Sequence, residues 1–425
     1  MSIIVQNENS GKKVGLAVKL AFGSLIVLYC INYFQRTAIP GGIFSHLQRD
    51  LGLNATEIAF MGTSFTCIYS LTQVFVGIII DRFGGMRTNV VGGALFAIGA
   101  LLFPLATSKY LMFFLRFCTG LGASTMFLGL VYEANAIFGR KNYAIVMGCT
   151  YSCAYFGGIM ASLPFAWLIR VFNWHSVLFF IGVVSMLAYI LFFFAQRKIE
   201  RQTVEKEQAV SPLKSFLEVS ANGRTWMACM LGTVVFADYF VILTVLGKKF
   251  LEDFPKMSPE GAARVLFCMS VSVMVMAFCS SLLSRLLGNR RKPFAIAIAA
   301  LNLAAIVGMI LAIRMNAGSG VFALLFCAFA VCAGLCPVNT MLTQEVNARR
   351  NTTLVTGLNN MMNYLGVALF SVFVGLILDC MGRPVDGVYA PEAYSRLFEV
   401  LVGFGVASVV CACMLPETFG KYLKY

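Results

Sequence analysis

The chain has 425 residues, of which 59% are hydrophobic and 12% are charged. Soluble globular proteins carry roughly 25% charged residues, so this composition excludes a disordered chain, a small disulfide-linked secreted domain and a soluble nucleic-acid-binding protein. The net charge of +14 fits the basic loops of a membrane protein better than a nucleic-acid-binding surface.

Twelve apolar segments are each long enough, at about 20 residues, to cross a bilayer as a helix. In chain order they cover residues 14–38, 57–80, 88–107, 110–135, 143–169, 174–196, 224–247, 262–287, 293–314, 319–344, 353–379 and 393–415. A charged stretch separates the first six from the last six. The sequence therefore predicts an all-α membrane protein of twelve transmembrane helices in two pseudo-symmetric six-helix bundles, with an N-terminal bundle over 1–196, a linker over 197–223 and a C-terminal bundle over 224–425.

Local signals and basic residues orient these segments. Ser258, Pro259 and Glu260 form a helix-start signal shortly before the eighth segment. Lys and Arg are about twice as frequent on the side that carries the two termini and the linker, which the positive-inside rule assigns to the cytoplasm. We therefore expect an integral membrane protein with both termini in the cytoplasm, and its short loops favour a bacterial inner (plasma) membrane.

The two halves of the chain repeat weakly but in the same order. Asn32-Tyr33-Phe34 in the first segment parallels Asp238-Tyr239-Phe240 in the seventh. Farther along, Glu133-Ala134-Asn135-Ala136 parallels Glu345-Val346-Asn347-Ala348. Repeated halves of this kind place the binding site of a transporter near the membrane midplane, where the halves meet.

Three motifs resemble those of the major facilitator superfamily of secondary transporters. Residues 77–87 (GIIIDRFGGMR) are similar to the family's signature between helices 2 and 3, with Met86 where a second basic residue is common. Residues 116–122 (RFCTGLG) resemble its helix-4 motif. Residues 32–36 (NYFQR) are similar to the N-Y-x-x-R signature of the anion:cation symporter branch, with Gln35 where that branch often has Asp. The resemblance implies a twelve-helix transporter.

Arg36 is the clearest candidate for substrate binding. A charge inside a membrane helix costs about 2.5–3.5 kcal/mol, so it usually faces a cavity or a partner. Guanidinium suits bidentate capture of carboxylate or phosphate, and the resemblance implies that helix-1 arginines of the anion-transporting branch line the central cavity. The alternative is that Arg36 extends to the headgroups, since Pro40 and Gly41 follow soon after.

Further polar side chains at lipid depth are predicted to line the same cavity. Each could instead bond two helices together, which is the commoner role of a polar residue in a bundle. The predicted substrate-binding residues besides Arg36 are Tyr29, Asn32, Tyr33, Gln73, Tyr155, Asn359 and Asn363.

Two residues are predicted to couple transport to an ion gradient. Asp238 lies close to the middle of the seventh segment, where an ionised carboxylate is costly unless it is paired. It could carry a proton, hold a sodium ion, act as counter-ion to Arg36 in the empty protein, or make a structural hydrogen bond. The resemblance associates Arg116 with proton coupling, and packing against polar groups of helices 1 or 2 is the alternative.

Four charged residues are predicted to form a conformational latch, in which charge pairs and helix-end dipoles hold one conformation and break in another. Glu133 is expected within reach of either arginine of the 2–3 connection. The matching connection in the second half has Ser284 in place of the aspartate, which predicts a weaker latch there. The four latch residues are Asp81, Arg82, Arg87 and Glu133.

Small residues predict close helix packing in the fifth segment. Ala154, Gly158 and Ser162 have the four-residue spacing that lets one helix approach or slide against another.

The function that these features predict is secondary active transport of a small, anionic organic solute by alternating access, coupled to a proton or sodium gradient. A proton-coupled drug or metabolite exporter is the alternative within the same class. A polytopic membrane enzyme is disfavoured because His46 and His175, the two histidines, lie on separate connections. We expect no cofactor, no metal site and no nucleic-acid partner, and a monomer in the lipid bilayer that binds a small-molecule substrate together with the coupling ion.

Overall fold

The computed structural model describes residues 15–53, 55–198, 212–381 and 389–423, and within these ranges every regular element is helical. The α-helices up to residue 197 are α1 (Leu16–Ala38), α2 (Phe44–Leu51), α3 (Ala55–Phe83), α4 (Gly85–Leu102), α5 (Lys109–Met160), α6 (Leu163–Val171) and α7 (Trp174–Arg197). The later ones are α8 (Pro212–Ala221), α9 (Gly223–Val241), α10 (Gly247–Asp253), α11 (Pro259–Leu286), α12 (Lys292–Arg314), α13 (Ser319–Glu345), α14 (Thr352–Cys380) and α15 (Pro391–Met414). Short turns of other helix types are η1 (Gly41–Ile43), η2 (Phe103–Leu105), η3 (Ile242–Leu246, a π-helix) and η4 (Arg349–Asn351).

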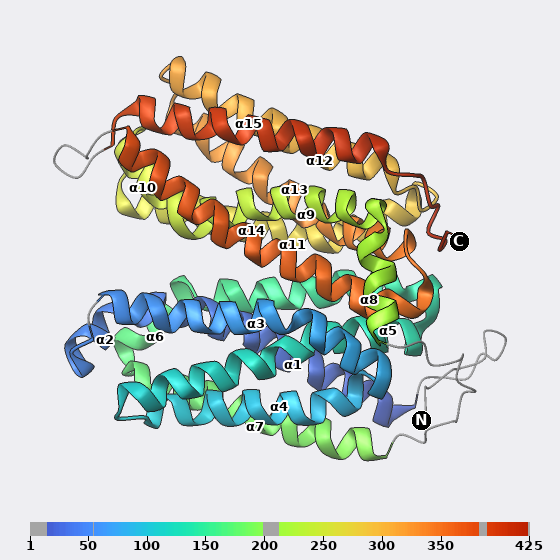
Figure 1. The fold of residues 1–425 in the computed structure, drawn as a ribbon. Coiled ribbons are helices and arrows are strands. Elements are labelled where there is room, and N and C mark those ends of the chain that lie inside the picture. The colour runs from blue at the N-terminus through green and yellow to red at the C-terminus, as the bar shows by residue number, and fades with distance from the viewer. Residues whose placement is uncertain (1–14, 54, 199–211, 382–388, 424–425) are drawn as a thin grey trace. The chain divides into compact units, whose positions relative to one another are not determined.

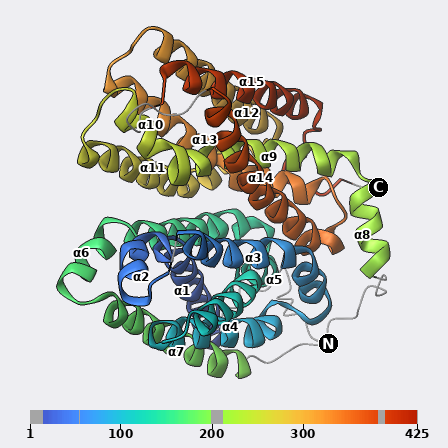
Figure 2. The ribbon, with the colours of Figure 1, turned by 60° about the vertical axis from the view of Figure 1, so that its left-hand side comes forward.

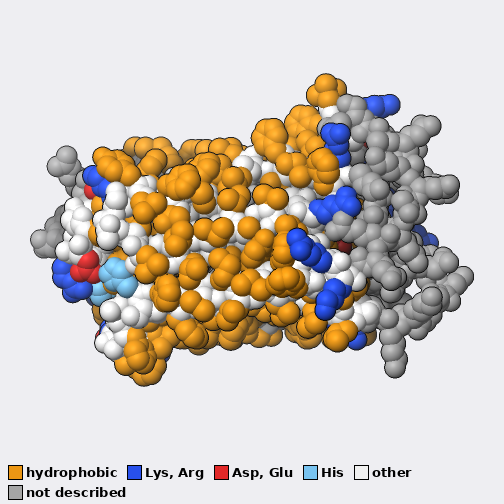
Figure 3. All heavy atoms as spheres, turned by 90° about the horizontal axis from the view of Figure 1, so that it is seen from below, with side chains coloured by type: hydrophobic (Ala, Val, Ile, Leu, Met, Phe, Trp, Pro, Cys, Tyr) orange, Lys and Arg blue, Asp and Glu red, His pale blue; other side chains and the backbone are white. Residues whose placement is uncertain are grey.

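Twelve helical stretches of the described residues are long and apolar enough to cross a membrane, from Leu16–Ala38 to Pro391–Met414. This number confirms the twelve segments predicted from hydropathy. Large apolar side chains stay exposed along them, including Phe75 at 67% and Leu324 at 73%, as a lipid-facing surface requires. Figure 3 shows one face of the molecule, where hydrophobic side chains cover the middle and Lys and Arg lie toward the two ends, more of them toward one end than the other.

Three helix boundaries have a clear local cause. At Gly139 the backbone takes φ +63°, a left-handed conformation open to glycine, and this break divides α5 into spans 109–139 and 142–160. The predicted segment 143–169 ends early, at Met160, because Pro164 at the start of α6 lacks the N–H that a continuous helix would need. The predicted start of the eighth segment is confirmed, since the Ser258 side chain accepts the Gly261 N–H.

The chain folds into two compact units, and the first comprises residues 1–216 together with 350–357. In it α5 packs against α1, α3 and α4, while α7 covers α1 and α4. These helices form the blue-to-green bundle of Figure 1. A buried apolar cluster from Phe34 to Leu178 occupies one end of the unit and includes Ile39, Met112 and Phe165.

The second unit comprises residues 217–349 and 358–425. In it α12 packs against α13 and α15, α9 packs against the same two helices, and α11 lies on α13 (Figure 2). Its apolar cluster includes Leu231, Ile298 and Leu342. The boundary between the units falls inside α8, a helix within the stretch 197–223 that was expected to be only a linker.

Candidate functional site

Arg36 lies in the last turn of α1, with aromatic rings around its guanidinium group. The Cζ atom is 4.3 Å from the ring centroid of Tyr69, 5.0 Å from Tyr33 and 5.7 Å from Phe65. Rings attract a cation through the negative potential of their faces. The side chain is half-buried, so the protein holds a positive charge inside an aromatic enclosure, near the end of a helix long and apolar enough to cross a membrane.

Arg116 of α5 binds the end of the helix that carries Arg36. Its guanidinium donates to the carbonyl oxygens of Ile39, at 3.0 Å, and Gln35, at 3.5 Å. The Cζ atom also lies 4.5 Å from the centroid of the Phe65 ring. The side chain is 1% exposed. These contacts agree with the packing role that the sequence left open, and proton coupling through Arg116 stays a prediction.

Among the other predicted substrate residues of the first unit, three tyrosines form a cluster beside Arg36, whereas Gln73 makes a bond between two helices. Tyr33 lies beside Arg36 and packs edge-on against Tyr155 and Tyr29, with centroid distances of 5.8 and 5.3 Å. Asn32, one residue earlier, is fully buried and neither end of its side-chain amide has a hydrogen-bond partner. Gln73 instead donates to the Ser124 carbonyl at 3.2 Å, a bond that joins α3 to α5.

Asn359 and Asn363 of α14 lie in the second unit, on the side that faces Gly232 of α9. A Cβ atom at Gly232 would stand 3.3 Å from the Asn359 Oδ1 and 3.4 Å from the Asn363 Oδ1. Asn339 of α13 reaches the same place, and Asn363 accepts a hydrogen bond from Thr233 at 3.4 Å. The absence of a side chain at Gly232 therefore lets three amides gather against α9.

Asp238, the predicted coupling residue of α9, is 2% exposed. Its Oδ2 atom accepts a hydrogen bond of 2.7 Å from the Asn302 side chain on α12. Arg36 and Asp238 lie in different units, so their predicted pairing stays a prediction.

Two of the four predicted latch residues, Glu133 and Asp81, bind helix N-termini. Glu133 accepts the Met86 backbone N–H at 2.7 Å, in the first turn of α4. Asp81 accepts the N–H of Leu354 at 3.2 Å, in the first turn of α14. Residues 350–357, which include this turn, are grouped with the first unit, whereas the rest of α14 belongs to the second. A carboxylate at a helix N-terminus satisfies a free N–H and favours the helix dipole. Arg82 and Arg87 are exposed, and Arg82 lies 5.3 Å from the Phe83 ring.

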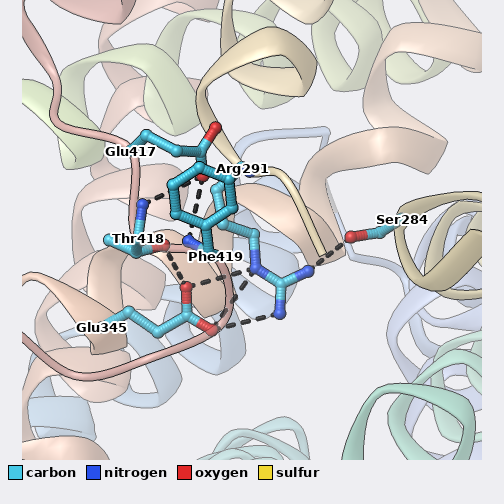
Figure 4. A network of polar contacts seen from close by, with 6 residues as sticks. All are labelled: Ser284, Arg291, Glu345, Glu417, Thr418 and Phe419. Atoms are coloured by element: carbon cyan, nitrogen blue, oxygen red, sulfur yellow. Dashed lines mark hydrogen bonds and ion pairs between the residues drawn. The ribbon is translucent and has the colours of Figure 1, made fainter. Parts of the chain in front are cut away.

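A buried ionic network occupies the corresponding end of the second unit (Figure 4). Arg291 reaches the Glu345 carboxylate through both Nε and Nη2, with the Nη2–Oε1 distance at 3.1 Å, and its Nη1 binds the Ser284 hydroxyl. Thr418, after the last helix, donates to Glu345 at 2.6 Å. Ser284 is the residue of the second half that corresponds to Asp81 in the first half. Its hydroxyl contacts Arg291, so this position binds an arginine in the second unit.

Glu417 caps α12 from outside that helix. Its carboxylate accepts the backbone N–H groups of Arg291, at 2.7 Å, and Lys292, at 3.1 Å (Figure 4). Burial opposes its ionisation, but these donors and the N–H groups of Phe419 and Thr418 outweigh burial, so the pKa of Glu417 lies below its usual value.

The sequence profile of the Major Facilitator Superfamily matches residues 25–371 of this chain. The chain belongs to the Major Facilitator Superfamily. The match covers most of both units, and it confirms the family resemblance and the twelve-helix fold. The superfamily consists of transporters, so the family is not one of enzymes.

Individual members of the superfamily are similar to parts of the chain. An uncharacterized transporter, YybO of Bacillus subtilis, is 27% identical over 47% of this chain and 46% of its own length. The probable galactarate/D-glucarate transporter GudP of the same organism is 27% identical over 43% and 41%, and its hexuronate transporter is 24% identical over 42% of each chain. The chain therefore spans less than half the length of these three relatives.

Several residues of these sites were not predicted. Phe65 and Tyr69 precede Gln73 at four-residue spacing, so a helical face shared with Gln73 was a signal that could have found them. Asn302 carried no such signal, because its relation to Asp238 depends on how α12 packs against α9. The contact between Glu345 and Thr418 also had no sequence signal, because the two residues are brought together only by the packing of the helices.

Proposed function

We propose that this chain is a secondary active transporter that moves a small organic anion by alternating access, driven by a proton or sodium gradient. The observation that carries the proposal is the guanidinium of Arg36, which lies on a candidate membrane-spanning helix and is held among Tyr33, Phe65 and Tyr69. The proposal includes an integral location in a bacterial plasma membrane, with both termini in the cytoplasm and a monomeric protein.

A guanidinium in this setting favours an anionic ligand. Low-dielectric surroundings strengthen its attraction to a carboxylate, and the planar fork can donate two parallel hydrogen bonds. The rings of Tyr33 and Tyr69 restrict the fork, so less side-chain entropy is lost when an anion binds. Arg116 supports the same arrangement, because it binds the carbonyl groups at the end of α1.

The relatives' names support a hydroxylated organic acid. Galactarate, D-glucarate and hexuronates combine carboxylates with several hydroxyl groups, and two relatives are named for carrying them. Asn359 and Asn363 are amides able to bond such hydroxyls. Alternating access, in which the substrate site opens first to one side of the membrane and then to the other, follows in this proposal from membership of the superfamily.

The test is a thermal-shift titration of the purified protein with glucarate, galacturonate and uncharged glucose. We expect the two acids to raise the unfolding temperature and glucose to have little effect. Arg36→Ala should weaken acid binding at least tenfold, about 1.4 kcal/mol, and Arg36→Lys should restore only part of it. Arg264→Ala, which removes an exposed arginine, is the matched control.

Uptake of a stabilising acid into proteoliposomes, with and without an imposed ion gradient, then tests transport itself. Stabilisation by organic cations instead of acids would favour the exporter. Equal binding of acids to the wild type and Arg36→Ala would overturn the assigned role of Arg36.

A further inference from the structure

Asp238 and Asn302 form an isolated polar pair inside the second unit. They are 2% and 0% exposed, and the Asn302 Nδ2 donates to the Asp238 Oδ2 at 2.7 Å. The two remaining oxygens, Oδ1 of Asp238 and Oδ1 of Asn302, are buried without a hydrogen-bond partner. Unsatisfied buried oxygens are rare, and each requires a physical explanation.

The positions one helical turn before the pair are apolar. They are Val235 on α9 and Ile298 and Ala299 on α12, all members of a buried apolar cluster. Among the ion pairs found in the described part of the chain, none includes Asp238. An ionised carboxylate would therefore be buried with one neutral donor and no cation, which costs several kcal/mol.

Other charged and titratable groups on the helices packed against α9 lie elsewhere or are weakly acidic. On α12 the charged residues are the terminal Lys292 and Arg314, and on α13 Glu345 binds Arg291 at the helix end. On α15, Arg396 and Glu399 bind each other at the surface. Cys332 of α13 is the titratable group that interacts with Asp238, and it is neutral as a thiol. The remaining titratable groups of these helices are Cys327 and Cys336 on α13, and Glu392, Tyr394, Cys411 and Cys413 on α15.

We propose that Asp238 and Asn302 together form the proton-binding site of the transporter, with Asp238 protonated in this conformation. A carboxylic acid and a primary amide can join through two hydrogen bonds in a ring: the amide N–H donates to one acid oxygen, and the acid O–H donates to the amide oxygen. The first bond is the observed one. The second would satisfy both unpartnered oxygens at once.

The inference rests on the proposed function and chooses between its two coupling ions. Oxygen-ligated cations such as Ca²⁺ take about six to eight ligands, whereas this pair offers two unused oxygens. One proton needs one acceptor. In the transport cycle, a hydronium ion on one side of the membrane gives its proton to the Asp238 carboxylate and leaves water. The O–H bond of the acid then breaks on the other side, where water takes up the proton as hydronium, so this site carries one proton in each cycle.

Infrared difference spectroscopy of the purified protein tests the protonation without any substrate. The wild type at neutral pH should show a protonated-carboxyl C=O band that disappears in Asp238→Asn. In Asn302→Leu, of similar volume, the band should move to higher wavenumber or disappear, because its amide partner is lost. The exchanged pair Asp238→Asn/Asn302→Asp keeps one acid and one amide, so it should restore the band. Ser280→Ala, which removes a buried hydroxyl from α11 of the same unit, should leave the band unchanged.

Transport assays provide the second readout. Asp238→Asn should abolish accumulation driven by a pH gradient while retaining exchange of substrate across the membrane, and the exchanged pair should regain part of the accumulation. A carboxyl band absent from the wild type, or stabilisation of the wild type but not Asp238→Asn by sodium chloride relative to potassium chloride, would overturn the proposal. If the band is present but no organic acid binds, the proposed substrate fails and the proton site stands.

Discussion

Arg291 and Glu345 form an ion pair whose side chains are only 5% and 8% exposed, and the pair joins the start of α12 to the end of α13. Thr418 adds a third contact from beyond α15. Because both charges are buried, removing one of them leaves the other without a counter-charge and without water, which costs far more free energy than at the surface.

Replacing Glu345 by Gln should destabilise the protein by about 3–5 kcal/mol, since it leaves the Arg291 guanidinium buried without its counter-charge. The matched control is Glu399→Gln, which removes one partner of an exposed pair with Arg314 and should cost about 0–1 kcal/mol. Thermal or denaturant unfolding in detergent measures both. Equal losses for the two variants would contradict a buried pair at Arg291.

Glu417 should make stability depend on pH in the acidic range. Its folded-state pKa is lowered, so its contribution is fully present above the unfolded-state pKa of about 4.3 and is lost as the pH falls through the folded-state pKa. The stability difference between the wild type and Glu417→Gln should therefore be largest near neutrality and shrink in acid. Unfolding temperatures from about pH 3 to pH 7 measure it. Ser280→Ala is the control: the stability that it loses relative to the wild type should not depend on pH. If the stability difference between the wild type and Glu417→Gln is also constant across this pH range, the prediction is wrong.

Asp81 should stabilise the start of α14 as a capping group. Asp81→Ala removes the acceptor of the Leu354 N–H and should cost about 0.5–2 kcal/mol. Asp81→Asn keeps an oxygen acceptor without the charge, so its loss should be smaller. Unfolding of the two variants side by side separates hydrogen bonding from charge, and a greater loss for Asn than for Ala would exclude capping.

Neighbouring glycines of α5 should respond very differently to alanine. A Cβ at Gly157 would lie 2.0 Å from the Cys30 carbonyl oxygen of α1, whereas at Gly158 the nearest atom, Thr37 Oγ1, is 3.7 Å away. Gly157→Ala should cost about 1–3 kcal/mol through overpacking, and Gly158→Ala should be close to neutral. Unfolding temperatures decide this, and similar values for the two variants would show that α1 and α5 can separate without cost.

The comparison of these glycines illustrates what the sequence could predict. The small-residue spacing at Ala154, Gly158 and Ser162 indicated a close approach in the right helix, but the contact is made by Gly157, one residue away. Spacing along a helix identifies faces, and the choice of face that meets a neighbour depends on packing among all the helices.

The number of transmembrane helices was predictable because it depends on the length of apolar runs alone. Arg36 was also predictable, since a charge inside an apolar segment is conspicuous. Its surroundings were harder to foresee: Phe65 and Tyr69 are ordinary residues of an apolar helix until α3 packs beside α1. Asn302 and Glu417 likewise acquire their roles through partners that are 64 and 125 to 126 positions away in the chain.

Phe65 stands within reach of two guanidinium groups, 5.7 Å from that of Arg36 and 4.5 Å from that of Arg116. One benzene ring therefore shares its electron density between two cations that would otherwise repel each other. Fluorine atoms on that ring would withdraw the density while largely preserving its shape, and the attraction of the ring for both guanidinium groups would weaken together. The electronics of a single unreactive side chain thus act on both arginines at once, including Arg36, which is proposed above to bind the substrate.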